Sequence, residues 1–271
     1  MPYCVELVTG ADLHRSDLVS ARSLTHLADA VSAREWLFFR CRGRAGARVT
    51  LLLPGWPAPD AAVERTLWAD AHRALDRHMQ ERTKRPALIE SEAPTPAWIH
   101  AHVAFLPEIE ATRVGERASG ASASALRNTR DRSLDLLALH LDGVESVKSL
   151  AARTFAQAFR LFCGPSGAER LVAMLLKQLL RPAQWSELDA FWPRRAALQR
   201  SGQLAAILAA ERAPEPARAA VAAASRSLLA AGQTAPSHAE GELRLGTELF
   251  ALANQLGFSR LEAAYLAVLA A

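Results

Sequence analysis

Two apolar runs joined by a short turn lie near the start of this chain and constrain its fold more than any other feature. The first is 35–42, Glu-Trp-Leu-Phe-Phe-Arg-Cys-Arg, and the second is 47–54, Ala-Arg-Val-Thr-Leu-Leu-Leu-Pro. Gly43 and Gly46 bound the turn between them. Strand-forming runs separated by a short glycine-containing turn are typical of a β-hairpin. We therefore expect a mostly antiparallel sheet in the N-terminal half.

Further elements are expected around this hairpin. Residues 3–8 have the composition of a strand, and residues 98–105 alternate with a period of two, so that Trp98, His100 and His102 share one face. The pattern also predicts helices over 12–33 and 61–82 and a strand over 86–90.

Nearly everything in the second half of the chain is expected to be helical. Residues 114–133 are small, polar and charged, which favours a mobile loop or lid, and 212–238 is predicted to be a mobile connection between helices. The predicted class is α+β, with a sheet-containing half over 1–113 and a helical half over 134–271. The two halves are expected to pack as a single unit over 1–271.

Composition excludes several classes of protein. The chain has 271 residues, a net charge of +4 and no apolar run of the roughly 18 residues that a membrane span needs. Cys4, Cys41 and Cys163 are too few and too scattered for a disulfide framework or a zinc site. The N-terminus has no signal-peptide pattern, so we expect a cytoplasmic location and no membrane partner. The charge forms no basic stripe with aromatic residues, so nucleic acid is not expected, although acidic partners are mildly favoured.

No cofactor or metal site is predicted. Gly164-Pro-Ser-Gly-Ala-Glu-Arg resembles a helix entry but lacks the lysine of a phosphate-binding loop, and no dinucleotide fingerprint or H-E-x-x-H motif is present. His100 and His102 could ligate a metal or line a cleft, but the sequence offers no third ligand beside them. Any activity is therefore expected to depend on polar side chains alone.

The C-terminal helix carries a pair of hydroxyl groups. Ser259 and Glu262 have the spacing of a capping box. Tyr265, one of two tyrosines in the chain, is expected to point inward because it belongs to an apolar stripe made of Leu261, Ala264, Tyr265, Val268 and Leu269. A buried phenol usually needs a hydrogen-bond partner. The helix therefore carries either an ordinary cap beside a satisfied core tyrosine or one wall of a site.

Three parts of the chain resemble the glutamate-eliminating, C-terminal domain of lantibiotic dehydratases, also called the thiopeptide-type bacteriocin biosynthesis domain. The hairpin strands 35–42 and 48–55 resemble its opening strands. The family's aromatic-x-Pro-Glu segment resembles Phe105-Leu-Pro-Glu108, and its Arg-Tyr-Gly segment resembles Arg113-Val-Gly115. Its closing Asn-x-Leu-Gly helix resembles residues 254–265. The match spans nearly the whole chain.

A free-standing domain of this length is most similar to the thiopeptide pyridine synthases. The resemblance implies a formal aza-[4+2] cycloaddition between two dehydroalanines of a ribosomally made precursor peptide, with loss of water and leader peptide and without a cofactor. It implies Ser259 and Tyr265 as catalytic residues, since they have the family's six-residue spacing. The substrate-binding candidates are Glu108, His100, His102, Asn254 and Arg113.

Departures from the wider family help to choose between activities. The turn 43–46 and the strand that begins at Arg48 lack the polar positions that follow the first strand in glutamate-eliminating domains, and Val114 replaces an aromatic residue. The lost polar positions weaken glutamate elimination and so favour the pyridine synthase, whereas Val114 makes the transfer of residue roles near Glu108 and Arg113 weaker than at the C-terminus. Two alternatives stay open: a free-standing glutamyl-elimination lyase and a non-catalytic leader-binding subunit.

Overall fold

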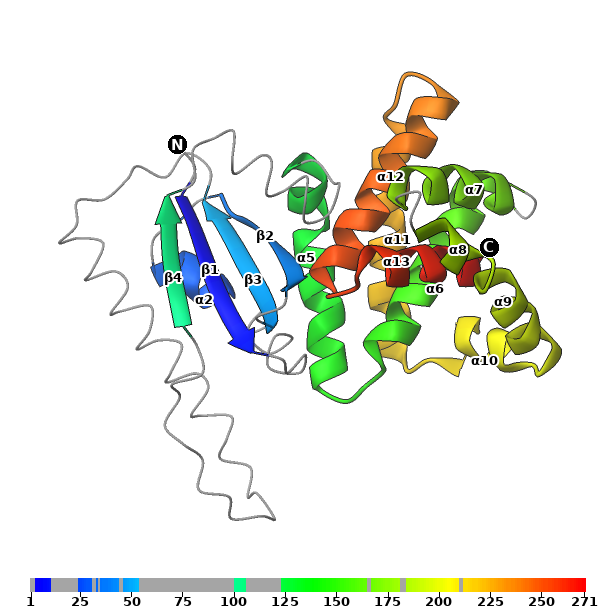
Figure 1. Ribbon diagram of the computed structural model, residues 1–271, viewed down its shortest axis with the longest axis horizontal. Helices are drawn as coiled ribbons and strands as arrows, with labels where there is room; N and C mark the ends of the chain where they lie inside the picture. The colour runs from blue at the N-terminus through cyan, green and yellow to red at the C-terminus, as the bar shows by residue number, and fades with distance from the viewer. Residues whose placement is uncertain are drawn as a thin grey trace, which may run out of the picture. The chain divides into compact units, whose positions relative to one another are not determined.

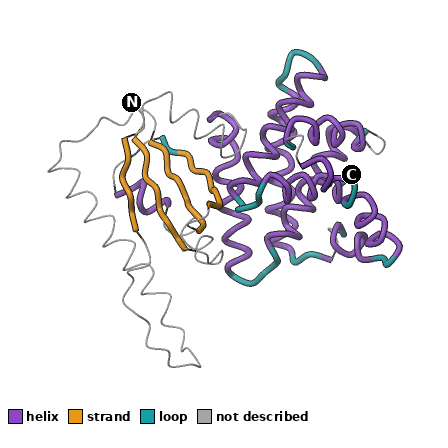
Figure 2. The backbone as a smooth tube through the Cα atoms, in the orientation of Figure 1, coloured by secondary structure: helices purple, strands orange, loops and turns teal. Residues whose placement is uncertain are grey.

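The computed structural model describes residues 3–10, 24–30, 33, 35–43, 46–53, 100–105, 123–164, 167–180, 184–209 and 212–271. The chain divides into two compact units, Met1–Val114 and Gly115–Ala271. All strands of the described residues belong to the first unit, and the described helices of the second unit follow it in sequence (Figures 1 and 2). The predicted α+β class is confirmed, whereas the packing of both halves into one unit over 1–271 stays a prediction.

The first unit contains a four-stranded antiparallel sheet with the order β2-β3-β1-β4. Its strands are β1 (Tyr3–Gly10), β2 (Leu37–Gly43), β3 (Gly46–Leu53) and β4 (His100–Phe105), and α2 (Leu24–Ala30) precedes β2. Gly43 pairs with Gly46, so the predicted hairpin is confirmed. The predicted strand over 3–8 is present in β1, and that over 98–105 is present for residues 100–105 as β4, while residues 98 and 99 lie outside the described residues. Of the predicted helix over 12–33, the described residues contain α2.

Consecutive side chains of the hairpin are buried, which explains its continuous apolar sequence. Phe38 and Phe39 are both buried, as are Leu51, Leu52 and Leu53. Because side chains alternate between the two faces of a sheet, burial of successive residues means that both faces of the hairpin are covered. The predicted helix over 61–82 and strand over 86–90 lie outside the described residues.

The second unit is a bundle of helices (Figure 1). They are α5 (Ala123–Leu141), α6 (Val147–Cys163), α7 (Ala168–Leu179), α8 (Trp185–Leu188), α9 (Phe191–Arg200), α10 (Gln203–Leu208), α11 (Glu215–Gln233), α12 (His238–Gln255) and α13 (Arg260–Ala270). Helix α11 packs against α5, α6 and α12, and α13 packs against α6, α7, α9 and α12. In the described part of the chain, no helix combines the length and apolarity needed to cross a membrane.

The central helix α6 illustrates how local signals and burial agree. The side chain of Ser146 caps its first turn by accepting the backbone N–H of Ser149. Phe155 and Phe159 lie one turn apart on its buried face and pack edge to face, with ring centroids 6.2 Å apart. The helix ends at Gly164, whose φ of 69° lies in the left-handed region that glycine adopts without strain.

The prediction of a loop over 114–133 is wrong for residues 123–133, which form the first half of α5. Their hydroxyl groups have acceptors: Ser133 donates to the carbonyl oxygen of Arg130 at 2.7 Å, and Thr129 shares its one proton between the carbonyl oxygen of Ala125 at 2.9 Å and the side-chain oxygen of Gln255 on α12 at 2.7 Å. Burial of Leu126 adds tertiary stabilisation that the polar composition does not reveal. Residues 114–122 lie outside the described part of the chain.

The predicted mobile connection over 212–238 is also wrong for most of its length, because 215–233 form α11. Pro214 is the N-cap, and Pro216 lies in the first turn, where the backbone N–H has no intrahelical partner and a proline costs little. The alanine-rich remainder buries Val221, Ala224 and Leu228. The prolines therefore start this helix and do not interrupt it.

Candidate functional site

The turn between α12 and α13 fixes the position of the C-terminal hydroxyl pair. Gly257 has a φ of 88°, in the left-handed region, and its N–H donates to the carbonyl oxygen of Asn254 at 2.9 Å. The N–H of Phe258 donates to the carbonyl oxygen of Ala253 at 2.9 Å. These two bonds form a Schellman motif, which ends α12 and satisfies its last carbonyl groups. The chain then enters α13 directly at Ser259.

Ser259 caps α13 in the capping box that the sequence predicts. Its Oγ accepts the backbone N–H of Glu262 at 3.2 Å, while the Glu262 carboxylate accepts the N–H of Ser259 at 2.8 Å. Ser259 is exposed. The cap uses the hydroxyl only as an acceptor, so its O–H remains able to donate to a ligand.

Tyr265 differs from the inward-pointing residue expected from the apolar stripe. Its neighbours Ala264, Leu266 and Ala267 are buried, but Tyr265 itself is only partly buried. Within the described residues, its hydroxyl has no hydrogen-bond partner. A partly buried phenol of this kind can form one wall of a site, which is one of the two alternatives for this helix.

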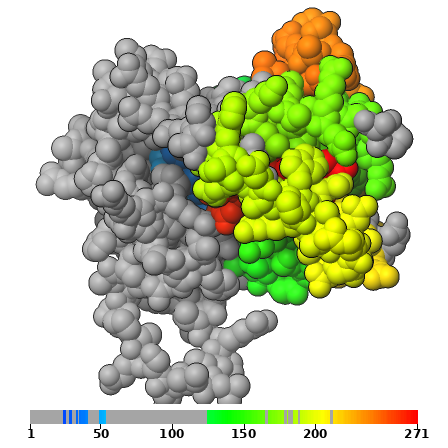
Figure 3. All heavy atoms as spheres, turned by 45° about the vertical axis from the view of Figure 1, so that its right-hand side comes forward, coloured from blue at the N-terminus to red at the C-terminus, as the bar shows by residue number. Residues whose placement is uncertain are grey.

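The two hydroxyl groups are offset along and around α13. Six residues correspond to a rise of about 9 Å and to a separation of about 120° around the helix axis. Ser259 and Tyr265 therefore cannot bind one small group together from the same side of the helix. The arrangement suits an extended ligand, such as a peptide, that crosses the N-terminal end of α13. On the face that Figure 3 shows, other helices of the same unit lie in front of much of the C-terminal segment.

The ring of Tyr265 rests on a residue from a different helix. Phe191, the first residue of α9, lies with its ring centroid 5.1 Å from that of Tyr265 and an interplanar angle of 51°. Phe191 is 4% exposed. Sequence reasoning missed this residue, because no local pattern links α9 to α13.

Asn254 lies on α12 in the same unit as the hydroxyl pair, and its side chain is buried. It is one of several buried polar residues near the end of α12. Gln255 donates to the carbonyl oxygen of Leu126 at 2.7 Å and accepts the Thr129 hydroxyl at 2.7 Å. These bonds hold α12 on α5 and fix the turn from which Ser259 projects.

Glu248 is a buried carboxyl group on α12. Asn128 of α5 donates to its Oε1 at 2.8 Å. Burial raises the pKa of Glu248, and the hydrogen bond from Asn128 only partly opposes this effect. Glu248 was not expected from the sequence, in which it is one of many acidic residues on helices.

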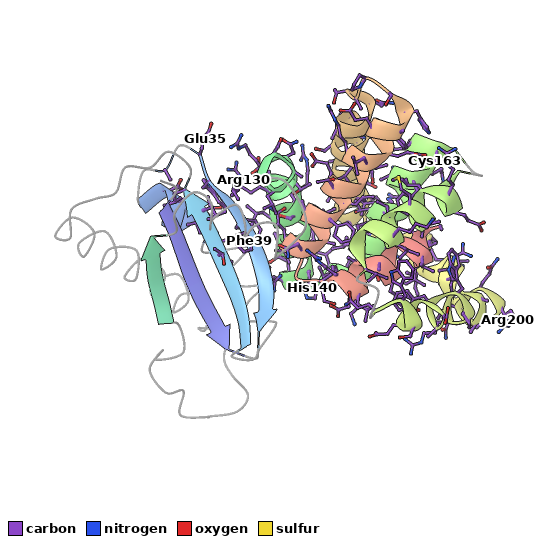
Figure 4. The ribbon with its side chains drawn as sticks, turned by 45° about the horizontal axis from the view of Figure 1, so that its top comes forward. Glu35, Phe39, Arg130, His140, Cys163 and Arg200 are labelled. Atoms are coloured by element: carbon purple, nitrogen blue, oxygen red, sulfur yellow. The ribbon has the colours of Figure 1, made fainter. Side chains whose placement is uncertain are left out.

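Two further groups have pKa values displaced by their surroundings. Burial alone would raise the pKa of Glu145, but hydrogen bonds from Arg153, at 2.8 Å, and from the N–H of Ser146 hold it below the ordinary value. The pKa of the Cys163 thiol is raised by burial and by the nearby Glu242 carboxylate. Both effects disfavour the thiolate form of Cys163, which is labelled in Figure 4 at the end of α6.

The remaining candidates belong to the first unit and not to the helical unit that carries the hydroxyl pair. His100 and His102 lie on β4 of the first unit, paired with Val8 and Glu6 of β1. Glu108 and Arg113 lie outside the described residues. Among the residues that are described, no group of three or more His, Cys, Asp and Glu side chains could hold a metal ion.

Two solved structures share this fold along nearly the whole chain. TbtD, the pyridine synthase from thiomuracin biosynthesis, is 17% identical with a TM-score of 0.58, and the match covers 99% of this chain and 97% of TbtD. TsrL is 12% identical with a TM-score of 0.50, covering 100% of this chain and 94% of TsrL. The match to the tRNA-dependent lantibiotic dehydratase MibB of Microbispora sp. 107891 covers 98% of this chain and 27% of MibB, at 15% identity and a TM-score of 0.43.

No protein-family model matches this chain, and no curated protein matches it. At these identities TbtD and TsrL establish a shared fold. The resemblance stated from the sequence is confirmed at that level, since TbtD, a pyridine synthase, covers the chain almost end to end.

Proposed function

We propose that this protein is a pyridine synthase of thiopeptide biosynthesis, which joins two dehydroalanines of a precursor peptide. The observation that carries the proposal is the Tyr265 hydroxyl, which has no partner among the described residues and lies on the same helix as the exposed Ser259. The fold shared with the pyridine synthase TbtD supports the same assignment.

The reaction needs orientation and proton transfer. The amide before one dehydroalanine moves its proton from nitrogen to oxygen, which gives an iminol and hence an azadiene. Two carbon–carbon bonds then form to the alkene of the second dehydroalanine and close a six-membered ring. Loss of the former amide oxygen as water, and of the leader as a peptide amide, leaves the aromatic pyridine.

The chain supplies groups for these tasks. Tyr265 would donate to, or exchange a proton with, the reacting amide, and Ser259 would donate its free O–H to the amide oxygen or the leaving hydroxyl. Holding the two alkenes together could contribute about 7 to 11 kcal/mol in the best intramolecular analogues. Asn254, Glu108, Arg113, His100 and His102 remain proposed substrate-binding residues.

The proposal is tested with a purified precursor peptide that carries azole rings and two dehydroalanines. Incubation with the protein should release the intact leader amide and give a core product with the mass expected after loss of water, both measured by mass spectrometry. A matched peptide with alanine in place of one dehydroalanine should give neither product.

Two other outcomes would overturn the proposal and identify its alternatives. Conversion of the glutamyl esters of a test peptide to dehydroalanines would indicate a glutamyl-elimination lyase. Alternatively, the protein binds the leader tightly but does not change the mass of the peptide by itself. If the peptide is then converted only when a partner enzyme is added, the protein is a non-catalytic subunit.

A further inference from the structure

The Tyr265 ring contacts α9, a helix that buries a single residue. Phe191 is the only buried residue of α9, whose ten residues are all described. Trp192 is 38% exposed, and Arg200 at the far end of the helix is also exposed (Figure 4). The Phe191 side chain therefore anchors α9, and one of its contacts is the ring of Tyr265.

This contact constrains the phenol without competing for its hydroxyl. A phenylalanine ring has no hydrogen-bonding group, so it can fix the plane of a neighbouring aromatic ring and leave the O–H unoccupied. A partly exposed tyrosine without such a contact would sample several rotamers. Tilted aromatic pairs at this separation are favourable arrangements.

We propose that Phe191 is a positioning residue for Tyr265, holding the phenol so that its hydroxyl meets the reacting amide. This inference rests on the proposed function, because it assumes that Tyr265 acts on the substrate. The experiment therefore has one measurement that does not depend on activity.

The chain has two tyrosines, Tyr3 and Tyr265, so a protein with ring-labelled tyrosine gives two sets of tyrosine signals by NMR. A Tyr3→Phe variant assigns them. In Phe191→Leu, which removes the ring but keeps an apolar side chain, the Tyr265 ring signals should shift and its ring should flip faster. Phe250→Leu is the matched control, because Phe250 on α12 is also 4% exposed. It should lower thermal stability comparably without moving the Tyr265 signals.

Kinetics with the dehydroalanine peptide supply the second measurement. A small misplacement of a reacting group can reduce rate by on the order of 10- to 100-fold. Phe191→Leu should therefore lower kcat by about tenfold or more with little change in KM, while Phe250→Leu keeps the wild-type kcat. Phe191→Trp, which restores an aromatic ring, should recover part of kcat.

Unchanged Tyr265 signals in Phe191→Leu would overturn the proposal, as would shifted signals with an unchanged kcat. If the wild-type protein does not convert the peptide, the proposed function fails by itself. The NMR comparison then still decides whether Phe191 fixes the Tyr265 ring, because it needs no substrate.

Discussion

Ser259 and Glu262 each satisfy a backbone N–H of the other at the start of α13, with hydrogen bonds of 3.2 Å and 2.8 Å. This reciprocal cap gives Ser259 a structural role in addition to its proposed role in catalysis. Substitutions must therefore distinguish the loss of the helix cap from the loss of the catalytic hydroxyl.

Ser259→Ala should lose the cap and destabilise the protein by about 0.5 to 2 kcal/mol. Ser259→Asn should retain stability, because Asn is an equally good N-cap, but should lose the hydroxyl and with it most of kcat. Ser237→Ala is the control, since Ser237 caps α12 through the N–H of Glu240. It should lose comparable stability and keep its activity. Denaturant unfolding and turnover measure both effects, and a fully active Ser259→Asn would leave Ser259 as a cap only.

Tyr265→Phe should leave the free energy of unfolding within about 0.5 kcal/mol of wild type, because the lost oxygen has no partner among the described residues. Turnover of the dehydroalanine peptide should fall by a factor of about 100 or more, as for removal of a general acid or base. Tyr3→Phe, at the other tyrosine, should be fully active. Wild-type turnover by Tyr265→Phe would remove the phenol from the mechanism.

Glu248→Gln should make the protein more stable at neutral pH. A carboxyl whose pKa is raised by burial binds its proton more tightly in the folded than in the unfolded state. The Glu248 carboxyl therefore stabilises the folded protein fully below the ordinary glutamate pKa of about 4.3. This stabilisation is lost as the pH rises through the pKa of Glu248 in the folded protein. The variant should show a weaker fall of stability over this range, measured by denaturant unfolding between about pH 4 and pH 8.

Glu145→Gln should change stability at neutral pH in the opposite direction. The Glu145 pKa is lowered in the folded protein, so its contribution is present above the ordinary pKa and is lost as the pH falls through the folded pKa. This variant should be less stable than wild type at pH 7, and the difference should shrink in acid. Parallel pH profiles for both variants would contradict the assignment of the two shifts.

Peptide binding should weaken as salt rises. The net charge of +4 favours acidic partners, so the Kd of an acidic leader peptide, which the proposed function expects, should increase several-fold between about 50 and about 300 mM salt. Fluorescence anisotropy of a labelled leader measures it, with a leader whose acidic residues are replaced by glutamine as the control. Equal salt dependence of the two peptides would exclude the electrostatic contribution.

Activity should survive exhaustive dialysis against EDTA and should not require a nucleotide, because the proposed reaction depends on side-chain hydroxyls. If EDTA abolishes turnover and added zinc restores it, this prediction is wrong. His100 and His102 would then be candidate metal ligands. In that case a His100→Ala, His102→Ala double variant should no longer respond to zinc.

Local patterns determined the parts of this protein in which a few consecutive residues supply both partners of an interaction. The hairpin from Leu37 to Leu53 and the Ser259 capping box follow from spacing alone, since turn and cap bonds join residues that are neighbours in sequence. The family resemblance also rests on short segments of neighbouring residues.

The tertiary structure decided the features that depend on distant segments. Gln255 reaches Leu126, 129 residues earlier, and Phe191 supports Tyr265 from a separate helix. Residues 123–133 are helical because burial of Leu126 and internal bonding of Thr129 outweigh a polar, loop-like composition. The sequence alone determined the local turns, caps and periodicities, because their hydrogen-bonding partners are close in the chain. Only tertiary packing decided which side chains were buried, which pKa values were displaced and which hydroxyl was left without a partner in the described structure, because these depend on contacts between residues far apart in sequence.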